Sequence, residues 1–191
     1  NTPGYCAIDA SGNLWVTNLG FNDVAEYPKG STKPSATITK GLTYPVGVAI
    51  DHAGNLYVSN PEPFSAPNVQ VYAPGGKSPS RTITDGATVP VGIAIDAHDT
   101  LYVTNAAESG NIEEYRSGHG TPYRTITDEL VYPKDVVVDK NGWLYVSNNG
   151  HSSDQQAILE FPPRSLKPSS KEITQGFFNP QGLAYFPPVL P

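Results

Sequence analysis

The chain has 191 residues, enough for one domain with a sizeable hydrophobic core. Its net charge is −6 and it contains no run of basic residues, which argues against a nucleic-acid-binding protein. No apolar run approaches the roughly 20 residues that a membrane-spanning helix needs. The 19 Pro and 18 Gly residues recur at regular intervals and therefore predict many turns rather than disorder.

Residues 45–60 are the clearest copy of a strand-turn-strand pattern that is repeated along the chain from its N-terminus. Val48–Ile50 is short, apolar and bordered by turn residues, as expected for a buried strand. Asp51 and Gly54 favour a turn, because Asp can bond its own backbone and Gly adopts positive φ without steric cost. Leu56–Ser59 follows as a second strand, rich in residues that suit a pleated sheet.

The same elements recur in order about every 43 residues. The turn Asp stands at Asp9, Asp51, Asp96 and Asp139. The second strand begins with Leu-aromatic-Val at residues 14–16, 56–58, 101–103 and 144–146. A third strand is expected at residues 24–27, 69–72, 112–115 and 158–161. A fourth is expected at residues 36–39, 81–84, 124–127 and 171–174.

Four strands in about 43 residues is the period of a β-propeller blade. Leu56 and Val58 face one side of the second strand and Tyr57 faces the other, so both sides are apolar or aromatic. A blade packed between two neighbours needs this pattern, whereas a sheet with one solvated face does not. The sequence therefore predicts an all-β propeller of four-stranded antiparallel blades in a single unit. The predicted repeats are 3–44, 45–89, 90–132 and 133–179, with a partial repeat at 180–186.

The repeat Pro-x-Gly-Val-Ala-Ile-Asp-x-x-Gly-Asn-Leu-Tyr-Val-Ser-Asn resembles the NHL-repeat family of propellers over nearly the whole chain. Val71–Gly75 and Arg81–Thr84 are similar to its bacterial exported subgroup. Few Lys, many Ser, Thr and Asn and no Met are also typical of an exported protein, so we expect a secreted or periplasmic location. The resemblance does not fix an activity, because such propellers include binding scaffolds, lyases and lactonase-like enzymes.

The partial repeat raises the question of how the ring closes. Pro180–Tyr185 begins like the other inner strands, but Phe186 stands where the turn Asp belongs. Six blades, the number that the resemblance implies, need about 260 residues. Three arrangements remain open: part of a six-bladed ring, a small four-bladed ring with the last strand as a cover, or an open arc completed by another chain. An unpaired strand edge also predicts self-association through open blade edges.

In the family that the chain resembles, two sets of loops share one rim: those between second and third strands, and those before each inner strand. Binding residues commonly lie on loops carried by a rigid scaffold. The predicted ligand-binding rim consists of Tyr44, Phe64, Tyr132, Asp135, Asn149 and His151. The predicted ligand is a protein, a carbohydrate or another small molecule.

Metal and catalytic chemistry are less well supported. His52 and His98 lie in turns at the rim opposite His151, so a zinc site of converging imidazoles is not expected. No cofactor is predicted; a calcium ion, which needs only oxygen ligands, would use Asp135, Asn148 and Asp154. No catalytic residue is predicted, since there is no Gly-x-Ser-x-Gly elbow. Cys6, the one cysteine, is predicted to be a small buried apolar residue.

Two further recurring positions have structural interpretations. Asn18, Asn60, Asn105 and Asn148 are predicted to cap strand ends by bonding loop backbone. Tyr27, Tyr72, Tyr115 and Phe161 are predicted to pack between blades. The sequence thus predicts a non-catalytic binding or interaction module. The alternatives are a metal-dependent, lactonase-like hydrolase or lyase of the propeller type, and a structural matrix or filament subunit.

Overall fold

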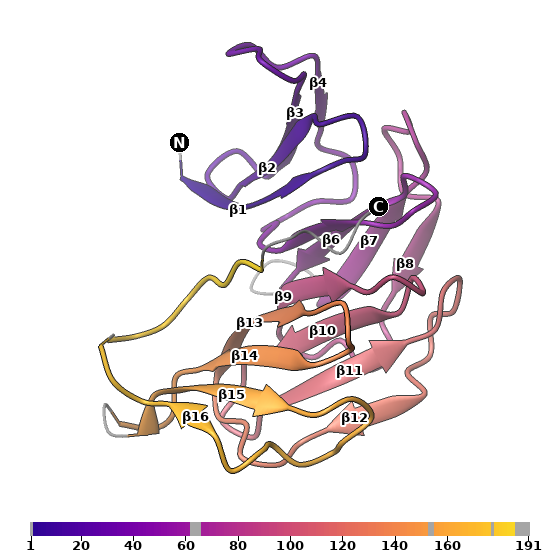
Figure 1. Cartoon of the computed structure of the whole chain (residues 1–191). Coiled ribbons are helices and arrows are strands. Elements are labelled where there is room, and N and C mark those ends of the chain that lie inside the picture. The colour runs from indigo at the N-terminus through magenta and orange to yellow at the C-terminus, as the bar shows by residue number, and fades with distance from the viewer. Residues whose placement is uncertain (1, 62–65, 153–154, 177, 186–191) are drawn as a thin grey trace.

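The computed structural model describes residues 2–61, 66–152, 155–176 and 178–185 of the chain. In these ranges, sixteen strands form four antiparallel sheets of four strands, each in simple up-and-down order (Figure 1). Each sheet is one blade of a propeller, so the predicted all-β fold is confirmed. Within the described ranges, no helix is long and apolar enough to cross a membrane.

The blades follow one another along the chain. Blade 1 contains β1 (Pro3–Ile8), β2 (Leu14–Asn18), β3 (Asp23–Tyr27) and β4 (Ala36–Ile38). Blade 2 contains β5 (Val48–Ile50), β6 (Leu56–Asn60), β7 (Asn68–Tyr72) and β8 (Arg81–Ile83). Blade 3 contains β9 (Pro90–Ile95), β10 (Leu101–Asn105), β11 (Asn111–Tyr115) and β12 (Arg124–Ile126). Blade 4 contains β13 (Pro133–Val138), β14 (Leu144–Asn148), β15 (Ala157–Phe161) and β16 (Glu172–Ile173).

The turn after each inner strand is built as its residues predict. Asp51 Oδ1 accepts a hydrogen bond from Asn55 N at 2.8 Å, and Asp51 Oδ2 accepts one from Tyr57 Oη at 3.2 Å. Gly54 has φ 82°, and Asp99 takes the equivalent position in blade 3 with φ 58°. Asp is one of the few residues with a side chain that tolerates this left-handed conformation. The repeated Asp therefore ties each turn to the strand that follows it.

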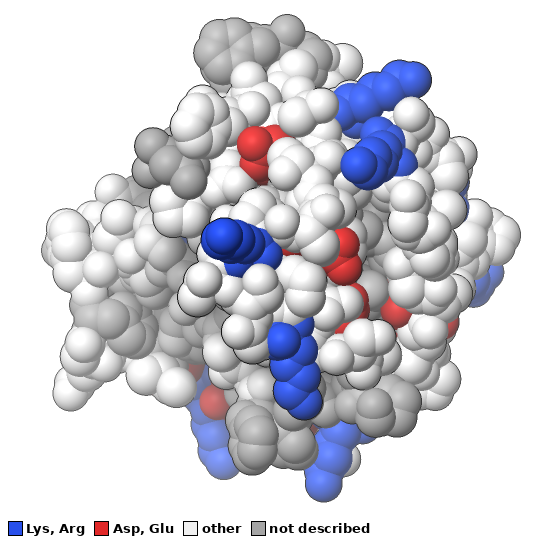
Figure 2. Space-filling model, turned by 90° about the horizontal axis from the view of Figure 1, so that it is seen from above, with Lys and Arg blue, Asp and Glu red and all other residues white. Residues whose placement is uncertain are grey.

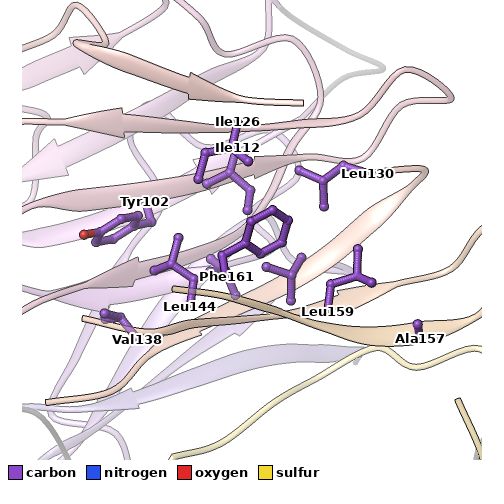
Figure 3. Close-up of a cluster of buried hydrophobic side chains, with 11 residues drawn as sticks. Tyr102, Ile112, Ile126, Leu130, Val138, Leu144, Ala157, Leu159 and Phe161 are labelled. Atoms are coloured by element: carbon purple, nitrogen blue, oxygen red, sulfur yellow. The ribbon is translucent and has the colours of Figure 1, made fainter. Parts of the chain in front are cut away.

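Three hydrophobic clusters of the described residues fill the three junctions between consecutive blades. Leu56 and Val58 pack toward blade 1, whereas Tyr57 packs toward blade 3, which confirms the predicted two-sided strand. Figure 3 shows the junction of blades 3 and 4, where Ile112 and Phe161 lie in one cluster. Tyr72, Tyr115 and Phe161 are fully buried between blades, as predicted, while Tyr27 in blade 1 is only half-buried.

Among the described residues, the two end blades each have one face that no other blade covers. In blade 1, Leu14 is 36% exposed, whereas its equivalent Leu56 in blade 2 is 4% exposed. Cys6 lies on the same face and is exposed, so the prediction that it is buried was wrong. Its position is buried in the later blades because a preceding blade covers it, and blade 1 has no such neighbour among the described residues.

One hydrogen bond recurs at every junction and reveals the place of the partial repeat. Near the end of the second strand of each blade, a Ser or Thr hydroxyl donates to a backbone carbonyl of the next inner strand. These bonds run from Thr17 to Val46 (2.7 Å), Ser59 to Val91 (2.6 Å), Thr104 to Lys134 (3.3 Å) and Ser147 to Gln181 (3.0 Å). Residues 180–185 therefore occupy the position of a fifth inner strand beside blade 4.

The fifth inner segment lies between blade 4 and blade 1. Tyr5 Oη, from blade 1, donates to the Gln181 carbonyl at 3.4 Å. The four inner strands and Leu183 and Tyr185 surround a central cavity of about 270 Å³. Among the described residues the structure thus shows four blades, with residues 180–185 placed between the fourth and the first (Figure 1). These residues take the place of the predicted inner strand without forming a strand, and Phe186 lies outside the described residues.

Candidate functional site

A groove of about 410 Å³ lies on the rim of blade 4, where its second-to-third-strand loop meets the loops that precede two inner strands. Side chains of mixed character line it: Tyr132, Lys134, Asn149, His151, Gln156 and Phe178. Phe178 is 79% exposed, the highest value among the described large hydrophobic residues. The groove therefore combines accessible aromatic surface with amide groups.

The strand-end Asn of blades 2, 3 and 4 fixes these loops. Asn148 Oδ1 accepts a hydrogen bond from Val131 N at 2.8 Å, and Asn148 Nδ2 donates to the Glu129 carbonyl at 3.1 Å. In blade 2, Asn60 Oδ1 accepts from Tyr44 N at 2.9 Å and Asn60 Nδ2 donates to Thr43 Oγ1 at 3.1 Å. The predicted capping role is confirmed for Asn60, Asn105 and Asn148, whereas Asn18 Nδ2 donates to the Asp23 side chain at 2.7 Å. In blade 4 the cap holds the backbone that leads into Tyr132.

Tyr132 and His151 form the aromatic side of the groove. Their ring centroids lie 6.2 Å apart with an interplanar angle of 85°, an edge-to-face arrangement. Tyr132 has φ 49°, and its N–H donates to the Ala107 carbonyl at 2.8 Å. A bulky residue in this left-handed region is strained, and such strain clusters at binding and catalytic sites.

Amide groups form the other side. Asn149 Nδ2 donates to Asn179 Oδ1 at 2.6 Å, and Asn179 N donates to Gln156 Oε1 at 2.7 Å. Gln181 Nε2 also donates to Asn179 Oδ1, at 2.8 Å. Asn149 Oδ1 is shielded from solvent, and within the described ranges nothing donates to it. The network thus leaves the shielded oxygen of Asn149, a residue that lines the groove, without a donor among the described residues.

The structure brings together three of the six predicted rim residues, Tyr132, Asn149 and His151. Tyr44 is half-buried at the equivalent position of blade 2 and is not among the described residues that line the groove. Phe64 lies outside the described residues, and so does Asp154 of the predicted calcium set. Sequence analysis missed Lys134, Gln156 and Phe178. Phe178 lies in the loop before residues 180–185, and the loops before inner strands were predicted to lie on this rim. The sequence therefore contained a signal that could have identified Phe178.

Asp135 lies in the central cavity rather than in the groove. Its side chain is buried; Oδ1 accepts from Val136 N at 2.9 Å and Oδ2 from Leu183 N at 2.8 Å. Burial raises the pKa of this carboxyl group to about 7, although the two backbone hydrogen bonds oppose the rise. Burial beside Asp135 also raises the pKa of Tyr5. Asp135 therefore anchors the fifth inner segment.

The described residues do not gather a metal site. No three His, Cys, Asp or Glu side chains in the described ranges lie close enough to hold an ion. Asn148 is occupied in capping, as shown above, and His52 Nδ1 lies 2.6 Å from Asp99 Oδ1 at a first-to-second-strand turn.

No protein-family model matches this sequence, and no curated protein matches it. Solved structures match it well. The hydrazine synthase of Kuenenia stuttgartiensis superposes with a TM-score of 0.77 over 89% of this chain and 48% of its own, at 20% identity. A chain of a nidogen/laminin complex superposes with a TM-score of 0.77 over 94% of this chain and 66% of its own, at 19% identity. The virginiamycin B lyase of Staphylococcus aureus superposes with a TM-score of 0.65 over 84% of this chain and 52% of its own, at 14% identity.

The fold is a β-propeller. The chain spans about half to two thirds of the length of these solved chains. At such low identity the likeness shows the fold alone, and propellers carry many unrelated functions. On the face in Figure 2, Lys and Arg side chains are spread among other residues and form no continuous basic surface.

Proposed function

We propose that this chain is a non-catalytic binding module of the NHL-repeat class, exported from the cell, with the groove on blade 4 as its ligand-binding surface. The repeat pattern that covers nearly the whole sequence supports the class, and the composition supports export. The observation that carries the proposal is the groove itself, in which a strained Tyr132 faces His151 beside the amide side chains of Asn149 and Gln156.

The lining of the groove favours an uncharged polar ligand, and we expect a carbohydrate. Aromatic rings offer flat apolar surface, here from Tyr132 and the exposed Phe178. Amide side chains such as Gln156 both donate and accept, which suits ligand hydroxyl groups. Lys134 is the one charged side chain among the described lining residues.

Binding to an array of oligosaccharides tests the proposal. His151→Ala and Phe178→Ala truncate exposed side chains in the groove, so each is expected to weaken binding about tenfold while the fold is retained. Phe21→Ala is the matched control, since Phe21 is 63% exposed in the corresponding loop of blade 1. Binding that all three variants retain would place the ligand elsewhere, and failure to bind any glycan would overturn the carbohydrate assignment.

A further inference from the structure

A second cavity, of about 320 Å³, lies between blades 1 and 2, beside the turns that join their first and second strands. Trp15 and Glu26 of blade 1 line one side of it, and residues 73–76 of blade 2 line the other. Trp15 is half-buried, whereas its equivalents Tyr57 and Tyr102 are only 4% and 7% exposed. The aromatic ring of blade 1 is therefore more accessible than its counterparts in blades 2 and 3.

At the other two junctions, an arginine of the fourth strand reaches the corresponding side chains. The Arg81 guanidinium carbon lies 6.0 Å from the ring centroid of Tyr57, and Arg81 Nη2 donates to Tyr57 Oη at 3.4 Å. In blade 3, Arg124 forms an ion pair with Glu114, in which Arg124 Nε donates to Glu114 Oε1 at 2.7 Å. Both blades thus place a guanidinium group against the residues that correspond to Trp15 and Glu26.

Blade 1 has no arginine at this position. Ala36 stands opposite Glu26 in the β3–β4 pairing, the register that Arg124 has in blade 3. The Glu26 carboxylate accepts hydrogen bonds from Asn13 Nδ2 at 3.4 Å and from Ser35 Oγ at 3.0 Å, and both donors are uncharged. The cavity therefore combines a carboxylate that has no ion-pair partner among the described residues with an accessible aromatic ring.

We propose that this cavity binds the side chain of an arginine residue in a peptide ligand, in the place that fourth-strand arginines take at the other two junctions. The guanidinium group pairs with the Glu26 carboxylate and lies against the Trp15 ring, which a bond from Nε1 to Asp9 Oδ2 at 3.3 Å holds in place. Ile38 lines the cavity and contacts the aliphatic stem. The site is separate from the rim groove and does not depend on the function proposed for it.

The charges around the cavity favour a cation. Three carboxylates line it, those of Asp9, Glu26 and Asp51, and its described lining contains no Lys or Arg. His52 also lines it, and His52 Nδ1 lies 2.6 Å from Asp99 Oδ1. The corresponding cavity between blades 3 and 4 is lined by basic as well as acidic side chains, the basic ones being Arg116, Arg124, Lys140 and Arg164. We therefore expect one site per chain for a cationic ligand.

Titration of the full chain with the peptide N-acetyl-Gly-Arg-Gly amide, followed by NMR, tests this proposal. The indole N–H signal of Trp15 should shift saturably, whereas that of Trp143, the other tryptophan, should not. The same peptide with Lys in place of Arg should bind about tenfold more weakly, because an ammonium group lacks the planar pair of donors that matches a carboxylate. Free arginine should also bind more weakly, because its own carboxylate approaches the carboxylates of Asp9 and Asp51.

Three variants locate the site. Ala36→Arg supplies the arginine that blades 2 and 3 already have, so it should fill the cavity and weaken peptide binding about tenfold or more. Thr37→Arg is the matched control, because it adds the same charge at an exposed neighbouring position on the other face of β4 and should leave binding unchanged. Glu26→Gln keeps the size of the side chain but removes its charge, and should also weaken binding about tenfold.

The proposal is supported if Glu26→Gln and Ala36→Arg lose binding while Thr37→Arg keeps it. Glu26→Gln decides alone if Ala36→Arg does not fold. A Trp15 signal that does not move, or equal loss in Thr37→Arg, would overturn the site. Equal binding of the lysine peptide would overturn the choice of a guanidinium group. Free arginine that binds as tightly as the peptide would identify a small molecule as the occupant and overturn the peptide assignment.

Discussion

One backbone position in each inner strand sets how closely the next blade can approach. At Gly47 a Cβ atom would lie 2.2 Å from the Val91 carbonyl oxygen, and at Gly92 it would lie 2.5 Å from Asp135 Cα. Only glycine fits at such distances. Blade 4 has Asp135 at this position, and the fifth inner segment bonds its carboxyl group through Leu183 N. The contact that is steric in blades 2 and 3 is polar and titratable in blade 4.

The raised pKa of Asp135 predicts a pH-dependent stability. A carboxyl group with a folded pKa of about 7 and an ordinary value of 3.8 contributes stability that is full below the ordinary value and is lost as pH rises toward 7. Unfolding free energy should therefore fall by about 2–3 kcal/mol between about pH 5 and pH 8.

Asp135→Asn cannot ionise and should remove most of that fall, as measured by urea denaturation at the two pH values. Glu108→Gln, which changes an exposed acidic residue, should keep the wild-type pH dependence. The same fall in Asp135→Asn as in the wild type would assign the titration to another group.

Among the elements, the second strand carries the bond that joins blade to blade. Ser59 Oγ accepts from Gly47 N at 2.7 Å within its own blade and donates to the Val91 carbonyl at 2.6 Å in the next. Thr17 and Thr104 occupy the same position in blades 1 and 3. The hydroxyl thus satisfies a buried donor and a partly buried acceptor.

Ser59→Ala should lower the unfolding free energy by about 1–3 kcal/mol, because it leaves buried backbone groups without partners. Ser59→Thr keeps the hydroxyl and restores the residue found in blades 1 and 3, so it should stay near wild type. Thermal or urea unfolding measures both. If the two variants lose equal stability, the hydroxyl is not the important group.

The strands were predictable because the same pattern of apolar and turn residues recurs in each repeat. A short apolar run is ambiguous between helix and strand by itself, but its recurrence at the same place identifies it as a strand. The burial of a strand side chain was predictable only in a repeat that has another blade on each side. Cys6 occupies a strand position that is apolar in every repeat, yet its exposure depends on a blade that does not precede it. Asp135 similarly follows the rim residue Tyr132 by three positions, but the inner strand carries its side chain into the central cavity. Tyr132, Asn149 and His151 could be predicted to lie together because their loops reach the same rim of the propeller in every repeat.

Over the whole molecule, the middle blades should be more sensitive to mutation than the end blades. Val58 is fully buried between blades 1 and 2, and Val58→Ala should cost about 1–3 kcal/mol through lost contacts and a cavity. Val16 is its equivalent in blade 1 and is only half-buried, so Val16→Ala should cost less. Equal losses in urea denaturation would contradict the blade order described here.

The distribution of histidines across the molecule predicts its metal content. His52 pairs with Asp99 at one end of the blades, whereas His151 lies in the rim groove at the other. Converging ligands are needed to hold zinc. Elemental analysis after dialysis should therefore show less than one zinc per chain. Stoichiometric zinc would instead favour the metal-dependent hydrolase or lyase.

The recurring hydroxyl-to-carbonyl bond has a consequence for how such a chain can change length. Its acceptor is a backbone carbonyl, which every residue possesses, and its donor stands at the same place in all four blades. The bond therefore depends on the position of the acceptor residue in the next repeat and not on its side chain. In a protein whose units contact only the next in line, stability is close to a sum over units and their junctions. Duplication or loss of one whole repeat leaves every remaining junction chemically complete, so the gene can grow or shrink by repeats without a new interface having to evolve.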